Sequence, residues 1–415
     1  MNRTSFAKTI LPLLLSILVL FTVLIAGCKK TEAPTPTPTK TPTSVPVLMT
    51  PTPTLTFTPM PTATPTSTSS EPTATPTATW TPTPAGPTLI EITDEINPLT
   101  GLKTDPAKLN RRPLTVKIAN YPAEARPQAG LNKADVMFEY ETEAYITRFT
   151  AIYLGQDAEL IGPVRSLRLP DAEVTSIFKA ALVASGGHPA VKKRMVEGKA
   201  WAEGYKRILC PEEPFLGDGG ALRRISGKKP RVELTMYTDT TAMWRVLDER
   251  GINGRQNFYD MFAFSEDLPL GGRDANTLTI IYKPGWVEVE YRYDAASKTY
   301  KRFDLGQPLI DELDGTQVAP ANVVVIYVNH VDTDILADEH DPKNPWYAVS
   351  IQLWGTGPAK VFRDGKVYDA TWVRENPQKE NDRLILRDAQ GQQIPFHPGT
   401  TWIQLVRLDG NVTIK

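Results

Sequence analysis

A long tract rich in alternating threonine and proline is the feature that most limits what this chain can fold into. It runs from Thr31 to about Pro87 and contains very few apolar or charged side chains. Proline lacks a backbone N–H donor and pushes the preceding residue toward extended geometry, and the few apolar groups cannot offset the entropy lost on folding. We therefore expect residues 28–88 to form a disordered, semi-rigid polyproline II stalk. At about 3.1 Å per residue the stalk would reach on the order of 180 Å when fully extended.

The first 27 residues have the pattern of an export signal. Arg3 and Lys8 precede an uncharged apolar run, Ile10–Ile25, which is short for a membrane span and is followed directly by lysines. The run ends in Leu-Ile-Ala-Gly-Cys28, which resembles a bacterial lipoprotein signal. The resemblance implies cleavage after residue 27 and acylation of Cys28, with palmitate among the acyl groups. The lipid bilayer would then be a partner, and the protein would be anchored on the extracytoplasmic face of the cell membrane. The alternative is an ordinary secretory signal that happens to contain a cysteine.

Charge and cysteine content exclude several classes of protein. The chain has 46 Lys+Arg and 47 Asp+Glu, a formal net charge of -1, so it lacks the basic excess expected of a nucleic-acid-binding protein. Only two cysteines are present, Cys28 and Cys210, which is too few for a disulfide scaffold or a cysteine-built zinc site. We expect Cys210 to be a partly buried residue without a function of its own.

The remaining chain predicts an α+β protein with two domains. Residues 89–266 mix strands with helices and predict an α/β domain, whereas residues 274–415 consist mainly of short strands separated by turn signals and predict an antiparallel β domain. The Pro- and Gly-rich stretch Asp267–Arg273 is the expected boundary. The predicted strands of the first domain are 114–119, 135–140, 147–153 and 181–185, and its predicted helices are 171–180, 189–197 and 240–250. The predicted strands of the second domain are 277–282, 287–293, 300–303, 322–328, 347–353, 360–362, 367–372, 383–386 and 402–405.

The densest group of polar residues in an apolar setting lies between Arg126 and His188. Three glutamates alternate from Glu139 to Glu143, so on a strand they would share a face. Glycine and proline in Gly162–Arg168 fix the backbone around two arginines, which suits a guanidinium that must bind a planar anion. A Ser-Gly-Gly-His loop follows a predicted strand, where α/β folds often place ligands. The predicted ligand- or partner-binding residues are Arg126, Glu139, Glu143, Arg148, Arg165, Arg168, Ser185 and His188.

Three interpretations of this group remain open. The first is a non-catalytic binding or scaffolding protein whose partner is an envelope protein or a cell-wall component. The second is a wall-directed hydrolase or transferase in which Glu139 or Glu143 is the acid/base and Arg165 or Arg168 clamps an anion. The third is structural, with the arginines simply paired to a solvated row of glutamates. Ser185 with His188 as nucleophile and base matches no known arrangement, so we predict no catalytic residue.

A cluster of histidines and carboxylates between His330 and Asp341 has the ligand types of a divalent-cation site, because carboxylate oxygens and imidazole nitrogens both bind such ions. Its spacing matches no known motif, and no phosphate-binding loop or dinucleotide fingerprint is present. We therefore predict neither a metal nor a cofactor. The residues of this cluster are His330, Asp332, Asp334, Asp338, Glu339, His340 and Asp341.

Short motifs occur in a definite order along residues 95–407. They are Asn97–Gly101, Arg126–Leu131, Ala134-Asp135, Ile146–Phe149, Ile161–Arg168, Gly186-Gly187, Asn322–Val325, Gly365 with Trp372, and Gly399–Trp402. Together they resemble the YerB-like family of bacterial lipoproteins, more closely in the N-terminal of its two domains. The family has no established activity, so the resemblance implies a fold but no reaction. One departure is Glu143-Ala144-Tyr145, where the family tends to have Glu-Gly-Gly. If those glycines let a ligand approach the backbone, Tyr145 would obstruct it here.

Overall fold

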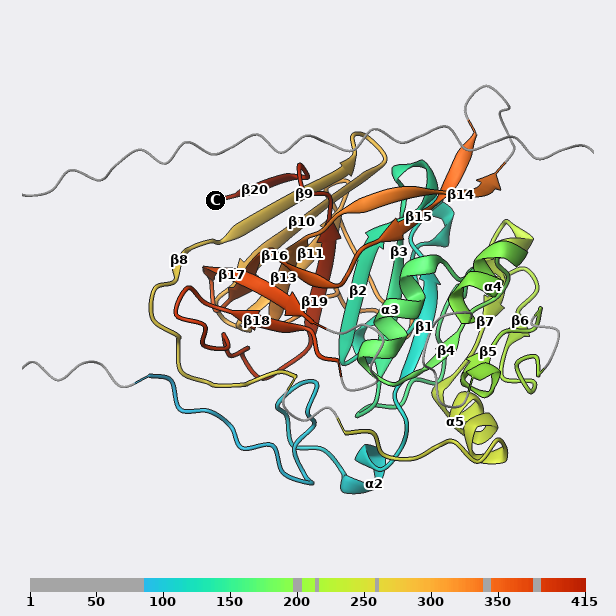
Figure 1. Ribbon diagram of the computed structural model, residues 1–415, viewed down its shortest axis with the longest axis horizontal. Helices are drawn as coiled ribbons and strands as arrows, with labels where there is room; N and C mark the ends of the chain where they lie inside the picture. Colours follow the sequence, from blue (N-terminus) through green and yellow to red (C-terminus); the bar gives the residue numbers. More distant parts are fainter. Residues whose placement is uncertain (1–85, 197–203, 213–215, 258–260, 339–344, 376–381) are drawn as a thin grey trace, which may run out of the picture. The chain divides into compact units, whose positions relative to one another are not determined.

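The computed structural model describes residues 86–196, 204–212, 216–257, 261–338, 345–375 and 382–415 (Figure 1). The signal peptide, Cys28 and the stalk up to residue 85 lie outside these ranges. Their cleavage, acylation and extended conformation therefore remain predictions from the sequence.

Both halves of the globular region contribute to one long mixed sheet. Its strand order is β18-β17-β16-β13-β19-β2-β3-β1-β4-β5, and β8 pairs with β17. The two halves meet where β2 and β19 pair in parallel, with Phe138 opposite Ile403 and Glu139 opposite Gln404. The first half supplies β1 (Leu114–Ala119), β2 (Val136–Glu141), β3 (Thr147–Tyr153), β4 (Ala181–Val183) and β5 (Ile208–Leu209). The second half supplies β8 (Arg273–Asp274), β13 (Asn322–Tyr327), β16 (Gly355–Arg363), β17 (Lys366–Arg374), β18 (Ile385–Arg387) and β19 (Thr401–Val406).

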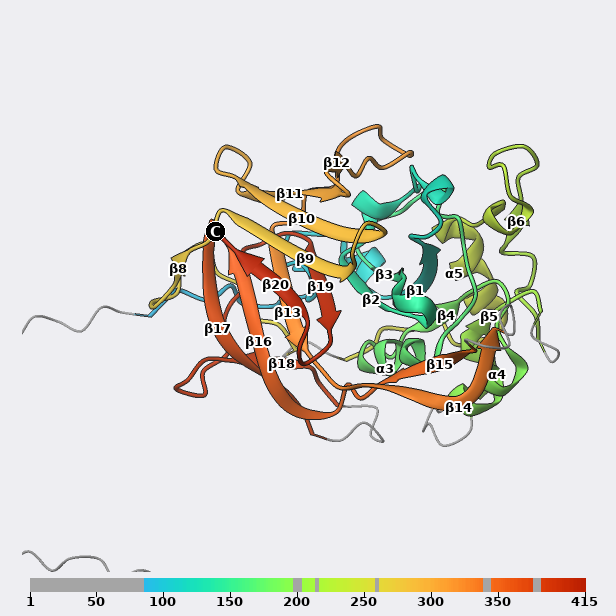
Figure 2. The same cartoon turned by 90° about the horizontal axis from the view of Figure 1, so that it is seen from above.

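A smaller antiparallel sheet covers one face of the long sheet (Figure 2). Its order is β12-β11-β10-β9-β20, comprising β9 (Thr277–Lys283), β10 (Val287–Asp294), β11 (Thr299–Asp304), β12 (Gln307–Pro308) and β20 (Asn411–Ile414). Alternate residues of β10 are buried, as expected for a strand with one solvated face. Its inward residue Tyr291 packs in one apolar core with Phe149 and Trp402, so the small sheet contacts both halves of the long one.

A helix and a hairpin lie against the opposite face of the long sheet. They are α3 (Leu169–Ile177) and the β14 (His330–Asp338)–β15 (Trp346–Ile351) pair. A second core forms there, in which Val174 of α3 packs with Phe138 and Ile403 of the sheet. The other regular elements are α2 (Pro106–Leu109), α4 (Pro189–Val196), α5 (Thr240–Glu249), β6 (Arg223–Arg224) and β7 (Met236–Tyr237).

The α+β class predicted from the sequence is confirmed, with a mixed first half and a mainly antiparallel second half. The predicted strands 114–119 and 147–153 match β1 and β3. The helix predicted over 171–180 ends earlier, at Ile177, because Lys179 adopts a left-handed φ of 48° that cannot continue a helix. The β14 strand and the C-terminal β20 were not predicted. The domain boundary at 267–273 remains a prediction, and β2 pairs with β19 across it.

Candidate anion-binding site

The predicted binding residues separate onto the two faces of the long sheet. Successive residues of a strand point to opposite sides, so Thr147 and Arg148 at the start of β3 face different layers. Glu139 belongs with Thr147 on the face covered by the small sheet. Arg148 lies on the other face, on the side of α3. The predicted Arg/Glu group is therefore two clusters.

Glu139 is fully buried in a hydrogen-bond network that connects the two halves of the chain. Its Oε1 accepts from Asn120 Nδ2 at 3.1 Å and Thr147 Oγ1 at 2.7 Å. Its Oε2 accepts from Arg302 Nη1 at 2.7 Å and Gln404 Nε2 at 3.0 Å. With four donors on one carboxylate and no exposed surface, Glu139 has no free oxygen for a substrate.

Arg126 extends the same network rather than a ligand site. Its Nη2 donates to Asn120 Oδ1 at 3.0 Å, and its Nε lies 3.6 Å from Asp304 Oδ2. Asp304 also accepts from Arg302 Nη2 at 2.8 Å. For Arg126 and Glu139, the geometry agrees with the third interpretation, in which the charged residues pair with one another. The main cation beside Glu139 is Arg302, which comes from the second half of the chain.

A buried polar network on the other face supports the second cluster. Lys117 Nζ lies 3.0 Å from Asp171 Oδ1 and also donates to the hydroxyl of Tyr140. Thr150 Oγ1 lies 2.8 Å from both Tyr140 Oη and Asp171 Oδ1. Burial lowers the pKa of Lys117 to about 8, although Asp171 opposes the shift. Sequence reasoning missed this network, and its one signal was a lysine within the apolar strand at 114–119.

Arg148 lies near this network at the start of β3 and is 5% exposed. Its Nη1 donates to the carbonyl of its neighbour Thr147 at 3.0 Å. Among the described residues, no carboxylate lies within ion-pair distance of its guanidinium. Burial, followed by repulsion from Arg168 and Arg165, lowers the pKa of Arg148 to about 9. A buried cation without a carboxylate partner is costly, so this position requires an explanation.

Two further arginines and one glutamate complete what we call the arginine cluster: Arg148, Arg165, Arg168 and Glu143. Arg168 Nε donates to Glu143 Oε2 at 2.7 Å. Arg165 Nη1 donates to the carbonyl of Glu233 at 2.9 Å, and its pKa is lowered by burial and then by Arg168. In the described part of the chain, Arg165 Nε and Glu143 Oε1 are buried without hydrogen-bond partners.

The arginine cluster therefore has three guanidinium groups but one carboxylate within ion-pair distance in the described ranges. Guanidinium groups bind carboxylates and phosphates through paired, charge-assisted hydrogen bonds. The excess positive charge, together with unused N–H groups on Arg148 and Arg165, gives the cluster the chemistry of an anion site.

The cluster lies at the edge where the parallel strands β1 and β4 end. Backbone bonds attach the Arg165–Leu167 segment to the loop after β4, since Ser185 N donates to Arg165 O at 3.0 Å and Leu167 N donates to Gly186 O at 3.2 Å. Gly187 has a φ of 147°, and a Cβ there would lie 2.9 Å from the side chain of Leu167. The glycine loop thus lets the two segments approach closely, and it positions the arginines.

Ser185 and His188 lie beside the cluster but do not interact as a catalytic pair. Ser185 Oγ donates to Glu212 Oε1 at 3.2 Å, and Gly186 N donates to the other oxygen of Glu212 at 2.7 Å. His188 is exposed, and its Nδ1 accepts from Ala190 N at 3.2 Å at the start of α4. Ser185 therefore has a carboxylate partner instead of the imidazole that nucleophilic catalysis would need.

Two residues of the predicted histidine/carboxylate cluster have other partners. His330 Nδ1 lies 2.9 Å from the carbonyl of Val328, and burial lowers the pKa of His330 to about 4. Asp334 pairs with Arg194 at 2.7 Å. Within the ranges that the structure describes, no three His, Cys, Asp or Glu side chains gather as metal ligands would. Residues 339–341 of the predicted cluster lie outside the described residues.

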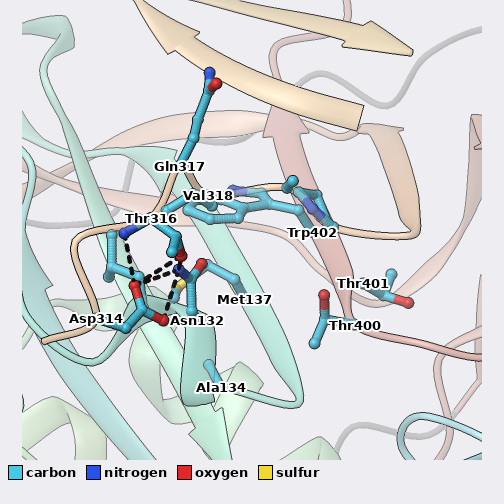
Figure 3. A pocket seen from close by; sticks show the side chains of 13 residues that line it. Asn132, Ala134, Met137, Asp314, Thr316, Gln317, Val318, Thr400, Thr401 and Trp402 are labelled. Carbon is cyan, nitrogen blue, oxygen red and sulfur yellow. Dashed lines mark hydrogen bonds between the residues drawn. The ribbon is translucent and has the colours of Figure 1, made fainter. Parts of the chain in front are cut away.

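A cavity of about 320 Å³ lies elsewhere, between the 3₁₀ turn Leu131–Lys133, the loop before β13 and the start of β19. Figure 3 shows Asn132, Asp314 and Thr316 joined to one another on one side of it. Asn132 Nδ2 donates to Asp314 Oδ1 at 3.1 Å and to Thr316 Oγ1 at 2.9 Å. These polar groups already satisfy one another, and none of the eight predicted binding residues lines the cavity. The arginine cluster is therefore the better candidate site.

Comparison with known proteins identifies the family. Residues 99–253 match the N-terminal domain, and residues 278–403 the C-terminal domain, of a family described as "Protein of unknown function (DUF3048)". The chain is 31% identical over 313 residues to "Putative lipoprotein YerB" of Bacillus subtilis (strain 168), covering 74% of this chain and 85% of that protein. This chain belongs to the YerB-like family.

A solved structure of the family agrees with this assignment. The crystal structure of YerB from Bacillus subtilis superposes with a TM-score of 0.61 at 28% identity, covering 77% of this chain and 99% of that chain. The family resemblance predicted from the motifs is confirmed. The relative's name fits a membrane-anchored lipoprotein. Throughout the described ranges, no helix has both the length and the apolar character that a membrane span requires.

The departure from the family pattern at Ala144 and Tyr145 has a backbone explanation. Both residues have positive φ values, 68° and 59°, a region in which glycine is free of the strain that a side chain introduces. Glycines here would therefore suit the turn itself. The side chain of Tyr145 is exposed, and the guanidinium of Arg407 lies 5.1 Å from the centre of its ring.

Proposed function

We propose that this protein is a non-catalytic, lipid-anchored binding protein on the extracytoplasmic face of the membrane. It binds an anionic group of an envelope partner, either a protein or a cell-wall component, at the arginine cluster. Acylated Cys28 is the anchor, and the Thr/Pro stalk carries the binding region away from the bilayer. The proposal adds the anchor and the ligand class to the family assignment.

One observation carries the proposal. Arg148 is 5% exposed, and no carboxylate of the described chain lies within ion-pair distance of it. Burial and two neighbouring arginines lower its pKa, and the more distant carboxylate of Glu143 opposes this shift only in part. Desolvating a cation beside like charges costs stability. A fold that keeps such a group has a reason other than its own stability, and an anionic ligand would neutralise the excess charge.

The alternative, a wall-directed hydrolase or transferase, has less support. Glu139 cannot be its acid/base because both carboxylate oxygens are fully bonded. Glu143 retains one free oxygen, but it is the one carboxylate within ion-pair distance of the cluster's arginines in the described ranges. The paired acids that glycoside hydrolysis uses are therefore not assembled there, and we propose no catalytic residue.

Calorimetric titration with inorganic phosphate tests the proposal. The protein is the soluble mature chain, residues 28–415, carrying Cys28→Ser. Wild type should bind phosphate saturably, and Arg148→Met should weaken binding at least tenfold, because a charge-assisted hydrogen bond contributes about 1.5–3 kcal/mol. Arg245→Met is the matched control, since this exposed arginine pairs with Glu249 on α5. Absence of saturable binding to wild type, or equal affinity of Arg148→Met, would overturn the proposal.

A further inference from the structure

Two aromatic side chains, Tyr121 and Trp286, stack beyond the end of β1. Tyr121 follows the end of β1, and Trp286 lies in the turn between β9 and β10. Their ring centroids are 5.6 Å apart, with an interplanar angle of 28°. Trp286 is 48% exposed and Tyr121 is half-buried. The pair therefore presents a flat, partly solvated aromatic surface.

A three-residue turn, Glu143–Tyr145, connects this surface to the arginine cluster. At one end of the turn, Glu143 accepts from Arg168. At the next residue, the carbonyl of Ala144 accepts from Lys283 Nζ at 3.2 Å. The same Nζ lies 4.2 Å from the ring centre of Trp286. Arg168 and Lys283, the lysine that lies over Trp286, therefore contact neighbouring residues of one turn.

Tyr121 adds a second connection between the two features. It is close enough to Arg148 to act electrostatically on the pKa of the guanidinium, opposing the lowering caused by burial. Arg148 is thus an electrostatic neighbour of Tyr121 as well as of Arg165 and Arg168.

These features suit one class of ligand. An aromatic face packs against the C–H face of a sugar ring, arginines bind a phosphate or carboxylate, and an unpaired carboxylate oxygen accepts a hydrogen bond from a hydroxyl. Glu143 Oε1 is buried without a partner in the described chain, and Glu143 is 8% exposed. It offers the acceptor that a hydroxyl requires and that a simple anion would not use.

We infer that the arginine cluster and its aromatic border bind an anionic sugar. The ring lies on Trp286 and Tyr121, the phosphate or carboxylate lies on the arginines, and a hydroxyl donates to Glu143. This inference rests on the proposed function and specifies its ligand class. A polymer of such units, presented outside the membrane, would be the natural envelope partner.

The test compares anions with and without a sugar by calorimetric titration of the soluble mature chain carrying Cys28→Ser. The probes are inorganic phosphate, glucose 6-phosphate and glucuronate. Wild type should bind glucose 6-phosphate or glucuronate at least fivefold more tightly than phosphate, and the better of the two identifies the anionic group. Trp286→Ala should remove that preference without changing the affinity for phosphate.

Two further variants keep the test specific. Trp286→Phe should retain most of the preference because it restores an aromatic face. Trp354→Ala is the control, since Trp354 has a similar exposure of 39% and should leave all affinities unchanged. Equal affinity of wild type for phosphate and both sugars, or a preference that survives Trp286→Ala, would overturn the inference. If wild type still binds phosphate and Arg148→Met weakens that binding, the proposed function is retained and only the sugar inference is wrong. If wild type binds none of the three probes, both the proposed function and the inference are wrong.

Discussion

Replacing Arg148 by methionine should stabilise the protein even though it removes the side chain on which the proposed site depends. Burial and two neighbouring arginines lower the pKa of Arg148 to about 9, and an arginine pKa ordinarily exceeds 12. Each pH unit of depression corresponds to about 1.4 kcal/mol against the charged form, so the penalty is on the order of 4 kcal/mol. The variant also loses the hydrogen bond to the carbonyl of Thr147, worth about 1 kcal/mol. We expect a net gain of about 3 kcal/mol.

Urea unfolding at pH 7 measures this gain, and Arg302→Met is the matched comparison. Arg302 is also buried, but it pairs with Glu139 and Asp304 at 2.7 and 2.8 Å. Its removal leaves the buried Glu139 without a cation and leaves Asp304 with only the longer contact to Arg126, 3.6 Å, and it should cost about 3–5 kcal/mol. The two variants make the same chemical change in a buried arginine and should have opposite effects. Opposite effects would show that the stability difference comes from the absence of a carboxylate partner at Arg148.

The pH dependence of the Arg148→Met effect gives a second check. The folded state releases the Arg148 proton near pH 9, whereas the unfolded chain holds it until a higher pH. Above pH 9 the unfolded state therefore binds more protons, and the contribution of Arg148 to wild-type stability rises with pH. The advantage of the variant should be constant below about pH 9 and should shrink above it. A variant that is less stable than wild type at pH 7 would refute the reasoning, because Arg148 would then be a stabilising cation.

Three other predictions concern stability and reactivity. Burial lowers the pKa of Lys117 to about 8, below the unfolded value of 10.5, so the unfolded chain binds more protons between these values. Between pH 8 and 10, the free energy of unfolding of wild type should therefore rise by ~2 kcal/mol relative to that of Lys117→Met. Urea unfolding measures this change, and a difference in midpoints that stays constant with pH would contradict it. Ala144→Gly should raise the free energy of unfolding by ~1 kcal/mol, because glycine adopts the φ of 68° at this position without strain. Ala172→Gly inside α3 is the control and should lower the free energy of unfolding by ~1 kcal/mol. Equal effects of the two substitutions would exclude backbone strain at Ala144. Burial raises the pKa of the Cys210 thiol to about 11, so alkylation by iodoacetamide at pH 8 should be ~100-fold slower in the native protein than in urea; similar rates would mean that the thiol is accessible.

Local patterns in the sequence predicted the elements that depend on local chemistry. The strands β1 and β3 are rich in β-branched and apolar residues, and their predicted bounds match those of the structure. A helix was predicted over 171–180, and local signals in the sequence support its start: Pro170 occupies the first turn of α3, and Asp171 accepts from the backbone N–H of Arg168 at 2.6 Å. Because such patterns span only a few residues, they can be recognised without knowledge of the fold.

The division of the predicted Arg/Glu group could not be foreseen, because it depends on distant pairing. Glu139 bonds to Gln404, 265 positions away, through the parallel register of β2 and β19. Its cation, Arg302, comes from a different sheet. Alternation along one strand shows which residues share a face, but it does not show what covers that face. Arg148 was selected for its charge, and only the fold shows that this charge is left without a carboxylate partner in the described chain.

The most direct test of the arginine cluster is an NMR titration of arginine side-chain Nε–H resonances with inorganic phosphate. The sample is the soluble mature chain carrying Cys28→Ser with ¹⁵N-labelled arginine. We expect the resonances of Arg148, Arg165 and Arg168 to shift together along one saturable curve while that of Arg245 stays constant. Unchanged cluster resonances, or shifts that follow those of Arg245 without saturation, would contradict it.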